Sequence, residues 1–312
     1  ICLILFLLTF LLPNFGFGQN TFSKRLHFGF PATVFTSIEV NDSCYYITGI
    51  IADSISPYKT GSFFSKFDFN GDLIYAKALI DTSITYEAWQ NTLTPLDDNS
   101  FILSGYSYDE NMKGLLIKLT TEGDTLFVKK YESPFILENP FIRNEDFIVM
   151  SDNGFAFLAT IFNGSFGHNI LLIRTDSLGQ VLWQKVYGGP EDEVPQSLIA
   201  TNDGGIIIGA QLVSTFGRTY LIKVDSVGEI EWEYLTPNNI TRGSAKDIHL
   251  LDDGSLIGLN SEGVEITSSA IGWNSMAFRL NENQNQEWET RFADSVPVFP
   301  IAFLEKNLPL PD

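Results

Sequence analysis

The sequence predicts an all-β fold in which one small antiparallel sheet is repeated along the chain. Helical periodicity is almost absent, and two features recur at intervals of about fifty residues. One is a turn that contains an aspartate. The other is a basic residue followed nine positions later by an aromatic one. These pairs are Lys66 and Tyr75, Lys118 and Phe127, Arg174 and Trp183, Lys223 and Trp232, and Arg279 and Trp288.

Each repeat begins with a predicted hairpin of two strands, a and b. An apolar run lies on both sides of each turn aspartate, and these aspartates are Asp42, Asp98, Asp152, Asp203 and Asp253. Around Asp203 the sequence SLIATNDGGIIIGA joins two β-rich runs through residue types that tolerate a positive φ. The other copies keep this turn chemistry, with LDDNS, SDNG and LDDGS.

A second predicted hairpin, of strands c and d, completes each repeat. In the fourth copy these strands are residues 220–224 and 230–234, and the turn between them contains Gly228. Gly71, Gly123 and Gly179 stand at the same offset, as expected for a glycine with positive φ that closes a short hairpin loop. Only the fifth copy, NENQNQ, has no glycine there.

A four-stranded sheet cannot bury both of its faces alone, so these repeats predict a β-propeller in which neighbouring blades stack. We expect five complete blades and a partial sixth, a fragment of a ring of six or more blades. The predicted blades are residues 31–82, 83–135, 136–192, 193–241 and 242–296, with a partial blade at 297–312 that residues 20–29 complete. The aromatic residues Tyr75, Phe127, Trp183, Trp232 and Trp288 are expected to pack between blades.

The repeated text from Trp183 to Trp232 resembles the YGG…D and DGG repeats of secreted bacterial β-propellers, which are often cargo of type IX secretion. The resemblance spans residues 31–296 and is strongest from 170 to 235. The segment VDSVGEIEW is more distantly similar to the tryptophan-docking motif of quinoprotein propellers, with a shorter spacing and without a vicinal cysteine pair. These resemblances imply a propeller architecture and export, and few assigned activities.

The first eighteen residues predict a signal peptide whose start is truncated, followed by a propeller domain over residues 19–312. An uncleaved anchor is the alternative. We therefore expect a protein that is secreted or held on the outer surface of a Gram-negative bacterium, with no membrane span after cleavage. Cys44 would then be the only cysteine, and its strand-like surroundings predict a buried, unreactive thiol.

The charge pattern excludes nucleic acid as a natural partner. The formal net charge is −19, and the acidic residues are spread evenly along the chain. We expect a monomer whose acidic surface keeps it soluble. No cofactor or metal is predicted, because His27, His168 and His249 lie in different repeats. The segment from Asp68 to Asp72 has part of a calcium-loop pattern, but a plain hairpin turn is favoured.

The two rims of the predicted propeller differ in sequence. The turn rim carries the uniform a–b and c–d turns, whereas the loop rim carries the variable b–c loops and the connections between blades. We therefore expect a ligand site on the loop rim. The candidate ligand-binding residues are Glu87, Trp89, Asp192, Arg242 and Trp273. The two tryptophans lie outside the nine-residue register, and with the acids they predict a mouth for a polar polymer such as a glycan.

Three functions fit this pattern. The first is a non-catalytic binding or scaffold module for a glycan or protein at the cell surface. The second is a glycoside hydrolase or lyase with carboxylates in the central funnel, which needs two acids roughly 5 to 9 Å apart. The third is a structural or adhesive module of a longer surface protein. No catalytic residues are predicted, since a GxSxG elbow and a phosphate-binding glycine loop are absent.

Overall fold

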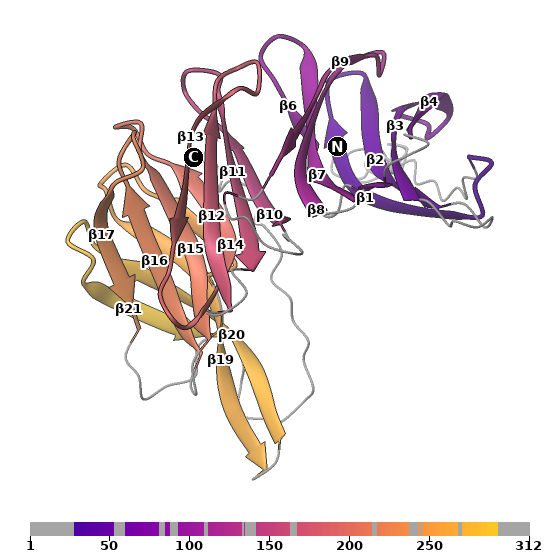
Figure 1. The fold of residues 1–312 in the computed structure, drawn as a ribbon. Helices are drawn as coiled ribbons and strands as arrows, with labels where there is room; N and C mark the ends of the chain where they lie inside the picture. Colours follow the sequence, from indigo (N-terminus) through magenta and orange to yellow (C-terminus); the bar gives the residue numbers. More distant parts are fainter. Residues whose placement is uncertain are drawn as a thin grey trace, which may run out of the picture.

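The computed structural model contains five β-sheets that follow one another in chain order (Figure 1). The residues it describes are 28–52, 60–80, 85–87, 93–108, 112–132, 134, 142–162, 167–213, 217–236, 243, 245–267 and 270–292. Each sheet is antiparallel, and in four of the five the strands pair in sequence order. The all-β class and the four-stranded blades of a propeller are therefore confirmed. The predicted signal peptide and the partial sixth blade at 297–312 lie outside the described residues, as do residues 20–27.

The strands of the first three sheets have the following bounds. The first sheet contains β1 (Ala32–Val40), β2 (Cys44–Ala52), β3 (Thr60–Asp68) and β4 (Leu73–Leu79). The second contains β5 (Thr85–Glu87), β6 (Leu93–Pro95), β7 (Ser100–Tyr108), β8 (Met112–Thr120) and β9 (Thr125–Tyr131). The third contains β10 (Ile142–Val149), β11 (Phe155–Phe162), β12 (His168–Thr175) and β13 (Val181–Tyr187). In the second sheet, strand a is split into β5 and β6, which both pair with β7.

The last two sheets complete the described fold. The fourth contains β14 (Asp192–Ala200), β15 (Ile206–Val213), β16 (Arg218–Val224) and β17 (Ile230–Leu235). The fifth contains β18 (Asp247–Leu250), β19 (Leu256–Thr267), β20 (Ala270–Leu280) and β21 (Gln286–Arg291). We number the contact between two neighbouring sheets by those sheets, so junction 3–4 joins the third and the fourth.

The hydrophobic core lies at the junctions rather than inside single sheets. Each cluster of buried side chains combines two consecutive sheets. In junction 3–4, for example, Leu158 and Leu172 of the third sheet pack with Ile208 and Ile222 of the fourth. Since burying apolar area is the main favourable contribution to folding, each sheet depends on its neighbours for stability. Cys44 belongs to the core of junction 1–2 and is buried, as the sequence predicted.

Polar side chains also link neighbouring sheets, at a bulge in strand a. The pairing register shifts within β1, β10 and β14, and the residues just after these shifts are Ser37, Asp146 and Ser197. Asp146 accepts a hydrogen bond from the backbone N–H of Leu198 at 2.8 Å, and the Ser197 hydroxyl donates to the carbonyl of Ala245 at 2.8 Å. Sequence reasoning did not identify these contacts, because a bulge leaves no clear residue signature.

The nine-residue spacing of basic and aromatic residues is a cross-strand pair. In all five sheets the basic residue of strand c lies directly opposite the aromatic residue of strand d, as Arg174 lies opposite Trp183. A register shift follows the basic residue in every sheet. The recurring motif therefore marks one fixed position beside a bulged hairpin.

The c–d turns share one hydrogen-bond pattern. In the fourth sheet, Asp225 Oδ1 accepts the backbone N–H groups of Val227 and Glu229 at 3.0 and 2.7 Å. Gly228 has a φ of +81° in this turn. Asp68 uses its Oδ1 in the same way, toward Asn70 and Asp72. The fifth turn has Gln284 at the glycine position, with a φ of +59°.

The a–b turns use their aspartate side chains in four of the five sheets. Asp98, Asp152, Asp203 and Asp253 each accept the backbone N–H of the residue two positions later. In the first sheet this role belongs to Asn41, which accepts from Ser43 and Cys44, and not to the predicted Asp42. Either residue type can cap such a turn, so the sequence alone leaves the choice open.

Two predicted loop segments are strands. The segment SEGVEITSSAIGWNS was expected to be a long b–c loop, but β19 and β20 pair through it, with Gly263 opposite Trp273. This hairpin extends beyond the rest of the fifth sheet (Figure 1). Its Val264, Ile266 and Thr267 are β-branched, and such residues favour strands. Glu87, expected in a connection, lies in β5 opposite Tyr106. Among the described residues, no helix is long and apolar enough to span a membrane.

Candidate functional site

The structure describes one of the predicted ligand-binding side chains, Asp192, on the loop rim. Glu87 and Trp273 are placed by their backbone only, in β5 and β20. Trp89 and Arg242 lie outside the described residues. The distance between the carboxylates of Glu87 and Asp192, on which the hydrolase hypothesis depends, is therefore not defined. The predicted mouth on this rim stays a prediction.

Asp192 is the first residue of β14 and joins the third and fourth sheets. Its Oδ1 accepts the backbone N–H of His168 at 2.6 Å and lies 3.3 Å from the Nδ1 of the same residue. Both side chains are a little under half exposed. Phe162 lies against the imidazole, with ring centroids 5.5 Å apart. His168 and Asp192 therefore contact each other and Phe162, and both side chains are also partly exposed to solvent.

Glu193, which the sequence analysis did not single out, is buried beside Asp192. It accepts hydrogen bonds from the backbone N–H of Gly189 at 2.9 Å and from Asn169 Nδ2 at 3.0 Å. A Cβ added at Gly188 would lie 2.3 Å from Glu193 Oε2, and Gly188 has a φ of +126°. Burial raises the pKa of the Glu193 carboxyl above its usual value. The YGG motif therefore makes room for this carboxylate, and its oxygens are used within the junction.

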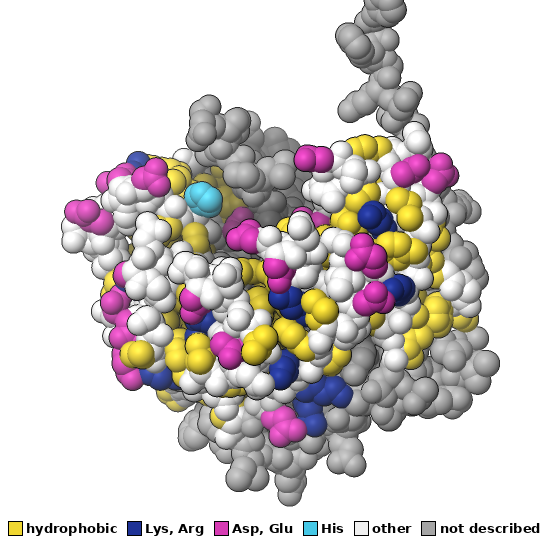
Figure 2. Space-filling view, turned by 90° about the horizontal axis from the view of Figure 1, so that it is seen from above, with side chains coloured by type: hydrophobic (Ala, Val, Ile, Leu, Met, Phe, Trp, Pro, Cys, Tyr) yellow, Lys and Arg dark blue, Asp and Glu magenta, His cyan; other side chains and the backbone are white. Residues whose placement is uncertain are grey.

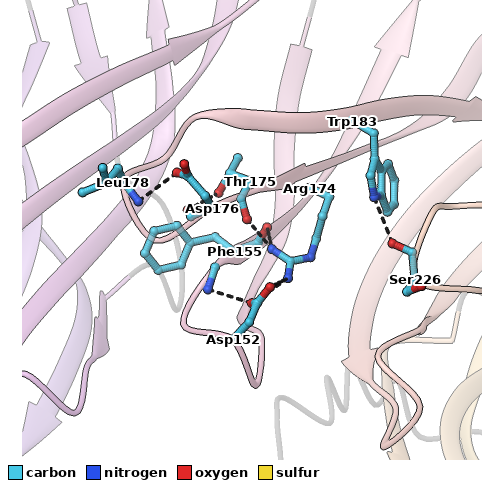
Figure 3. Close-up of polar contacts among 9 residues, drawn as sticks. Asp152, Phe155, Arg174, Thr175, Asp176, Leu178, Trp183 and Ser226 are labelled. Carbon is cyan, nitrogen blue, oxygen red and sulfur yellow. Dashed lines mark hydrogen bonds and ion pairs between the residues drawn. The ribbon is translucent and has the colours of Figure 1, made fainter.

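On the turn rim, the strand-d aromatic residues of three junctions contact the next sheet's c–d turn. Trp183 donates its indole N–H to the carbonyl of Ser226 at 3.1 Å (Figure 3). Tyr75 donates its hydroxyl to the carbonyl of Thr121. A Cβ added at Gly179 would lie 3.4 Å from the ring of Phe127, and one at Gly228 would lie 3.0 Å from the ring of Trp183. A turn glycine, which has no Cβ, leaves room for this approach, most clearly at Gly228.

Further side chains of strand d fill junctions 2–3 and 3–4. Tyr131 and Tyr187, four residues after the aromatic position, are buried and donate to the carbonyls of Gly179 and Gly228 at 3.0 and 2.8 Å. Lys185, two residues after Trp183, forms an ion pair with Glu229 at 2.6 Å. The sequence analysis did not use these positions, although the Tyr of the YGG motif marks one of them.

The basic residue of each pair has its own partner in four sheets. Lys118, Arg174, Lys223 and Arg279 form ion pairs with the a–b turn aspartates Asp98, Asp152, Asp203 and Asp253, at 2.6 to 2.7 Å. Arg174 is nearly buried, and both of its terminal nitrogens are used, one by Asp152 and one by backbone carbonyls (Figure 3). The turn aspartate and the basic residue, which recur separately in the sequence, thus form one contact. Their shared interval of about fifty residues could have suggested this pairing.

Junction 4–5 differs from the three junctions described above. The fifth c–d turn carries Gln284 where the others have glycine, so this turn has a side chain at the position that lies against the aromatic ring in the other junctions. Tyr234 stands in place of Lys185 and Thr236 in place of Tyr187. Among the described residues, the indole N–H of Trp232 has no hydrogen-bond partner, unlike that of Trp183. The aromatic residue and the turn therefore do not meet in the same way.

A hollow of about 440 Å³ lies in junction 4–5, on the turn rim. Its apolar lining is Trp232 with Ile207, Leu250, Leu251, Leu256 and Leu280, and Gly254 also lines it. Its polar lining comes from the turns and from the ends of strands c and d, and consists of Thr201, Asn202, Asp203, Lys223, Glu231, Asp252, Asn281, Glu282 and Gln284. The lining thus combines an aromatic ring and aliphatic side chains with a larger number of polar groups, and the volume falls in the range of small-ligand pockets.

Charges on the walls of the hollow are mostly negative. Lys223 is held by Asp203 at 2.6 Å and by Glu231. The Lys223 hydrogen bond lowers the pKa of the Asp203 carboxyl below its usual value, so that it stays ionised. Over the face seen in Figure 2, acidic side chains are spread widely with basic ones among them. No group of three or more histidine, cysteine or acidic side chains suited to a metal ion occurs in the described part of the chain.

Comparisons with known proteins leave the function open. No family model matches the chain, and no curated protein does. Three similar solved structures are a protein of unknown function from Dyadobacter fermentans, a periplasmic gluconolactonase from Pseudomonas aeruginosa and a thermostable family-43 glycoside hydrolase. They are 10, 12 and 12% identical, with TM-scores of 0.48, 0.43 and 0.45. The matches cover 78, 81 and 88% of this chain and 75, 69 and 96% of theirs. At these values the similarity carries no argument about activity.

Proposed function

We propose that this protein is a non-catalytic β-propeller that binds a glycan in the hollow of junction 4–5. The observation that carries the proposal is Trp232, whose ring lines the hollow and whose indole N–H has no partner among the described residues. An indole face packs against the C–H groups of a sugar ring, and its N–H can donate to a sugar hydroxyl. Trp183, the tryptophan at the same position in junction 3–4, has both groups in contact with the next sheet. Its ring lies against Gly228, and its N–H donates to the carbonyl of Ser226.

The polar groups at the edge of the hollow suit sugar hydroxyls. Asn202, Asn281 and Gln284 line it, and amide side chains both donate and accept hydrogen bonds. Asn281 Oδ1 already accepts two backbone N–H groups of its own turn, and Gln284 Nε2 donates to the carbonyl of Glu282. The Nδ2 of Asn281, the Oε1 of Gln284 and the amide of Asn202 are the groups that would meet a sugar. Asp203 stays ionised because of Lys223, which argues against a role as the proton donor of a glycosidase. In this proposal the protein acts outside the cell, as a secreted or surface-held module.

Binding to immobilised neutral and charged oligosaccharides, measured on a glycan array and then in solution by calorimetry, tests the proposal. Trp232→Ala should weaken binding at least tenfold, and Trp288→Ala, the equivalent change in the fifth sheet, should leave it unchanged. Since Trp232 also packs against the core of junction 4–5, Trp232→Ala should lower the midpoint of thermal unfolding, and its folded fraction must be measured.

A second variant separates lost binding from lost folding. Gln284→Gly restores the glycine that the other four turns have at this position and removes a side chain that lines the hollow. A glycine also tolerates the positive φ better. We expect this variant to be at least as stable as the parent and to bind glycans more weakly. Binding that persists in both Trp232→Ala and Gln284→Gly would overturn the proposal. If that binding is lost in the Trp89→Ala, Trp273→Ala double variant, the ligand site lies on the loop rim instead.

A further inference from the structure

We propose that the hollow of junction 4–5 selects sugars that carry a positive charge, such as glucosamine units, over neutral and acidic sugars. This inference rests on the proposed glycan binding and adds the class of sugar. It comes from the charges of the lining residues. Four carboxylates line the hollow, Asp203, Glu231, Asp252 and Glu282, and Lys223 is the one cation among its lining residues.

Lys223 cannot serve an anionic ligand well. Its ammonium group is held between Asp203 and Glu231, and its side chain is only 13% exposed. The three groups together carry one negative charge. A uronate or a sulfated sugar would have to displace a carboxylate from Lys223 and approach the other one. The wall of the hollow that the fourth sheet forms therefore repels anions even though it contains a lysine.

The opposite wall adds two carboxylates that have no partner. Asp252 lies in the a–b turn and Glu282 in the c–d turn of the fifth sheet, and both are exposed. Neither takes part in a hydrogen bond or an ion pair through its carboxylate within the described part of the chain. A cation in the hollow would therefore meet the free carboxylates of Asp252 and Glu282 and, on the other side, the net negative group of Asp203, Glu231 and Lys223. The face of the Trp232 ring also attracts cations.

This arrangement occurs in one of the five copies. At the position of Asp252 the fourth sheet has Asn202, the third Ser151 and the second Asp97. At the position of Glu282 the corresponding residues are Ser226, Ser177 and Thr121. Only the fifth copy has an acid at both positions, and it is the same copy whose turn has lost its glycine. Two independent departures from the repeat thus fall on the walls of one hollow.

Calorimetry with three oligosaccharides of equal length tests the inference: a glucosamine oligomer, its N-acetylated counterpart and a galacturonate oligomer. At pH 6, where the amines are protonated, the glucosamine oligomer should bind about fivefold or more tightly than the N-acetylated one, as expected for partly screened charge contacts. The galacturonate oligomer should bind most weakly. Raising the salt concentration should reduce the preference without abolishing binding.

The double variant Asp252→Asn, Glu282→Gln should remove the preference and keep the affinity for the N-acetylated oligomer. Asp97→Asn, at the matching turn position of the second sheet, is the control and should change neither value. Equal affinity of the parent for the charged and neutral oligomers would overturn the charge selectivity while leaving glycan binding intact. No binding of any oligomer would instead overturn the proposed function. A lysine oligomer that binds as tightly, independently of Trp232, would show that the hollow recognises cations rather than sugars.

Discussion

Junctions 3–4 and 4–5 are built from the same repeat, yet one is filled and the other is hollow. In junction 3–4, Trp183 and Tyr187 both donate hydrogen bonds to the next turn, and the absent side chain of Gly228 lets the ring lie against it. In junction 4–5, Trp232 meets a turn that carries Gln284, and Thr236 replaces the buried tyrosine. The core beneath both junctions is apolar and buried.

Under the proposed function, the two junctions show how a repeat protein gains a binding site without a change of fold. The apolar core holds both junctions together, so the turn contacts above it can vary at limited cost. In the junction whose turn carries Gln284 in place of glycine, a hollow is present, and the Trp232 ring lines it together with polar turn residues. Function can thus arise on the uniform rim, where a single copy departs from the others, as well as on the variable one.

The largest effect should come from the buried tyrosine that only the filled junction has. Tyr187→Ala removes a buried ring and its hydrogen bond to Gly228, and should lower the free energy of unfolding by about 3–5 kcal/mol. Thr236→Ala, at the same position in junction 4–5, removes a hydroxyl that accepts the N–H of Thr219 at 3.0 Å and should cost about 1 kcal/mol. Denaturant unfolding measures both. Equal costs would show that the two junctions are packed alike.

A medium effect should come from the turn position itself. Gly228→Ala forces a side chain onto a positive φ and to 3.0 Å from the Trp183 ring, and should lower the free energy of unfolding by about 2 kcal/mol. Gln284→Ala keeps the existing Cβ and should be nearly neutral, within about 0.5 kcal/mol. A neutral Gly228→Ala would mean that the ring and the turn are not in close contact.

The smallest effect should come from the ion pairs, which both junctions share. Hydrogen bonds from Arg174 and from Lys223 lower the pKa of Asp152 and of Asp203. A carboxyl with a lowered pKa stabilises the fold above its unfolded pKa of about 3.8, and this contribution is lost as the pH falls through the folded value. Asp152→Asn and Asp203→Asn should therefore each cost less than about 1 kcal/mol at pH 7, because both carboxylates are more than half exposed.

The acid dependence of these two variants sharpens the comparison. Their difference from the parent protein should shrink as the pH falls below about 4. Thermal unfolding followed by circular dichroism between pH 7 and pH 2 measures this. A clear inequality between Asp152→Asn and Asp203→Asn would mean that the ion pairs, and not only the turn glycine, distinguish the two junctions.

The sequence by itself determined the repeat, the strand number of each blade and the position of the aromatic residues. Those features are local, since a turn aspartate, a glycine with positive φ and a nine-residue spacing each specify a hairpin. The sequence also marked NENQNQ as the one c–d turn without a glycine at the position that the other four share. It assigned the long segment around Trp273 to a loop, because only the pairing of β19 with β20 reveals those residues as strands.

Only the tertiary structure decided which residues of different blades meet. The ion pair of Lys185 with Glu229 and the contact of Trp183 with Ser226 join residues 44 and 43 positions apart, and no local pattern specifies such distances. The burial of Glu193 behind Gly188 depends in the same way on how two sheets approach. The hollow beside Trp232 forms for the same reason, since it follows from the space between two packed sheets and not from either sheet alone.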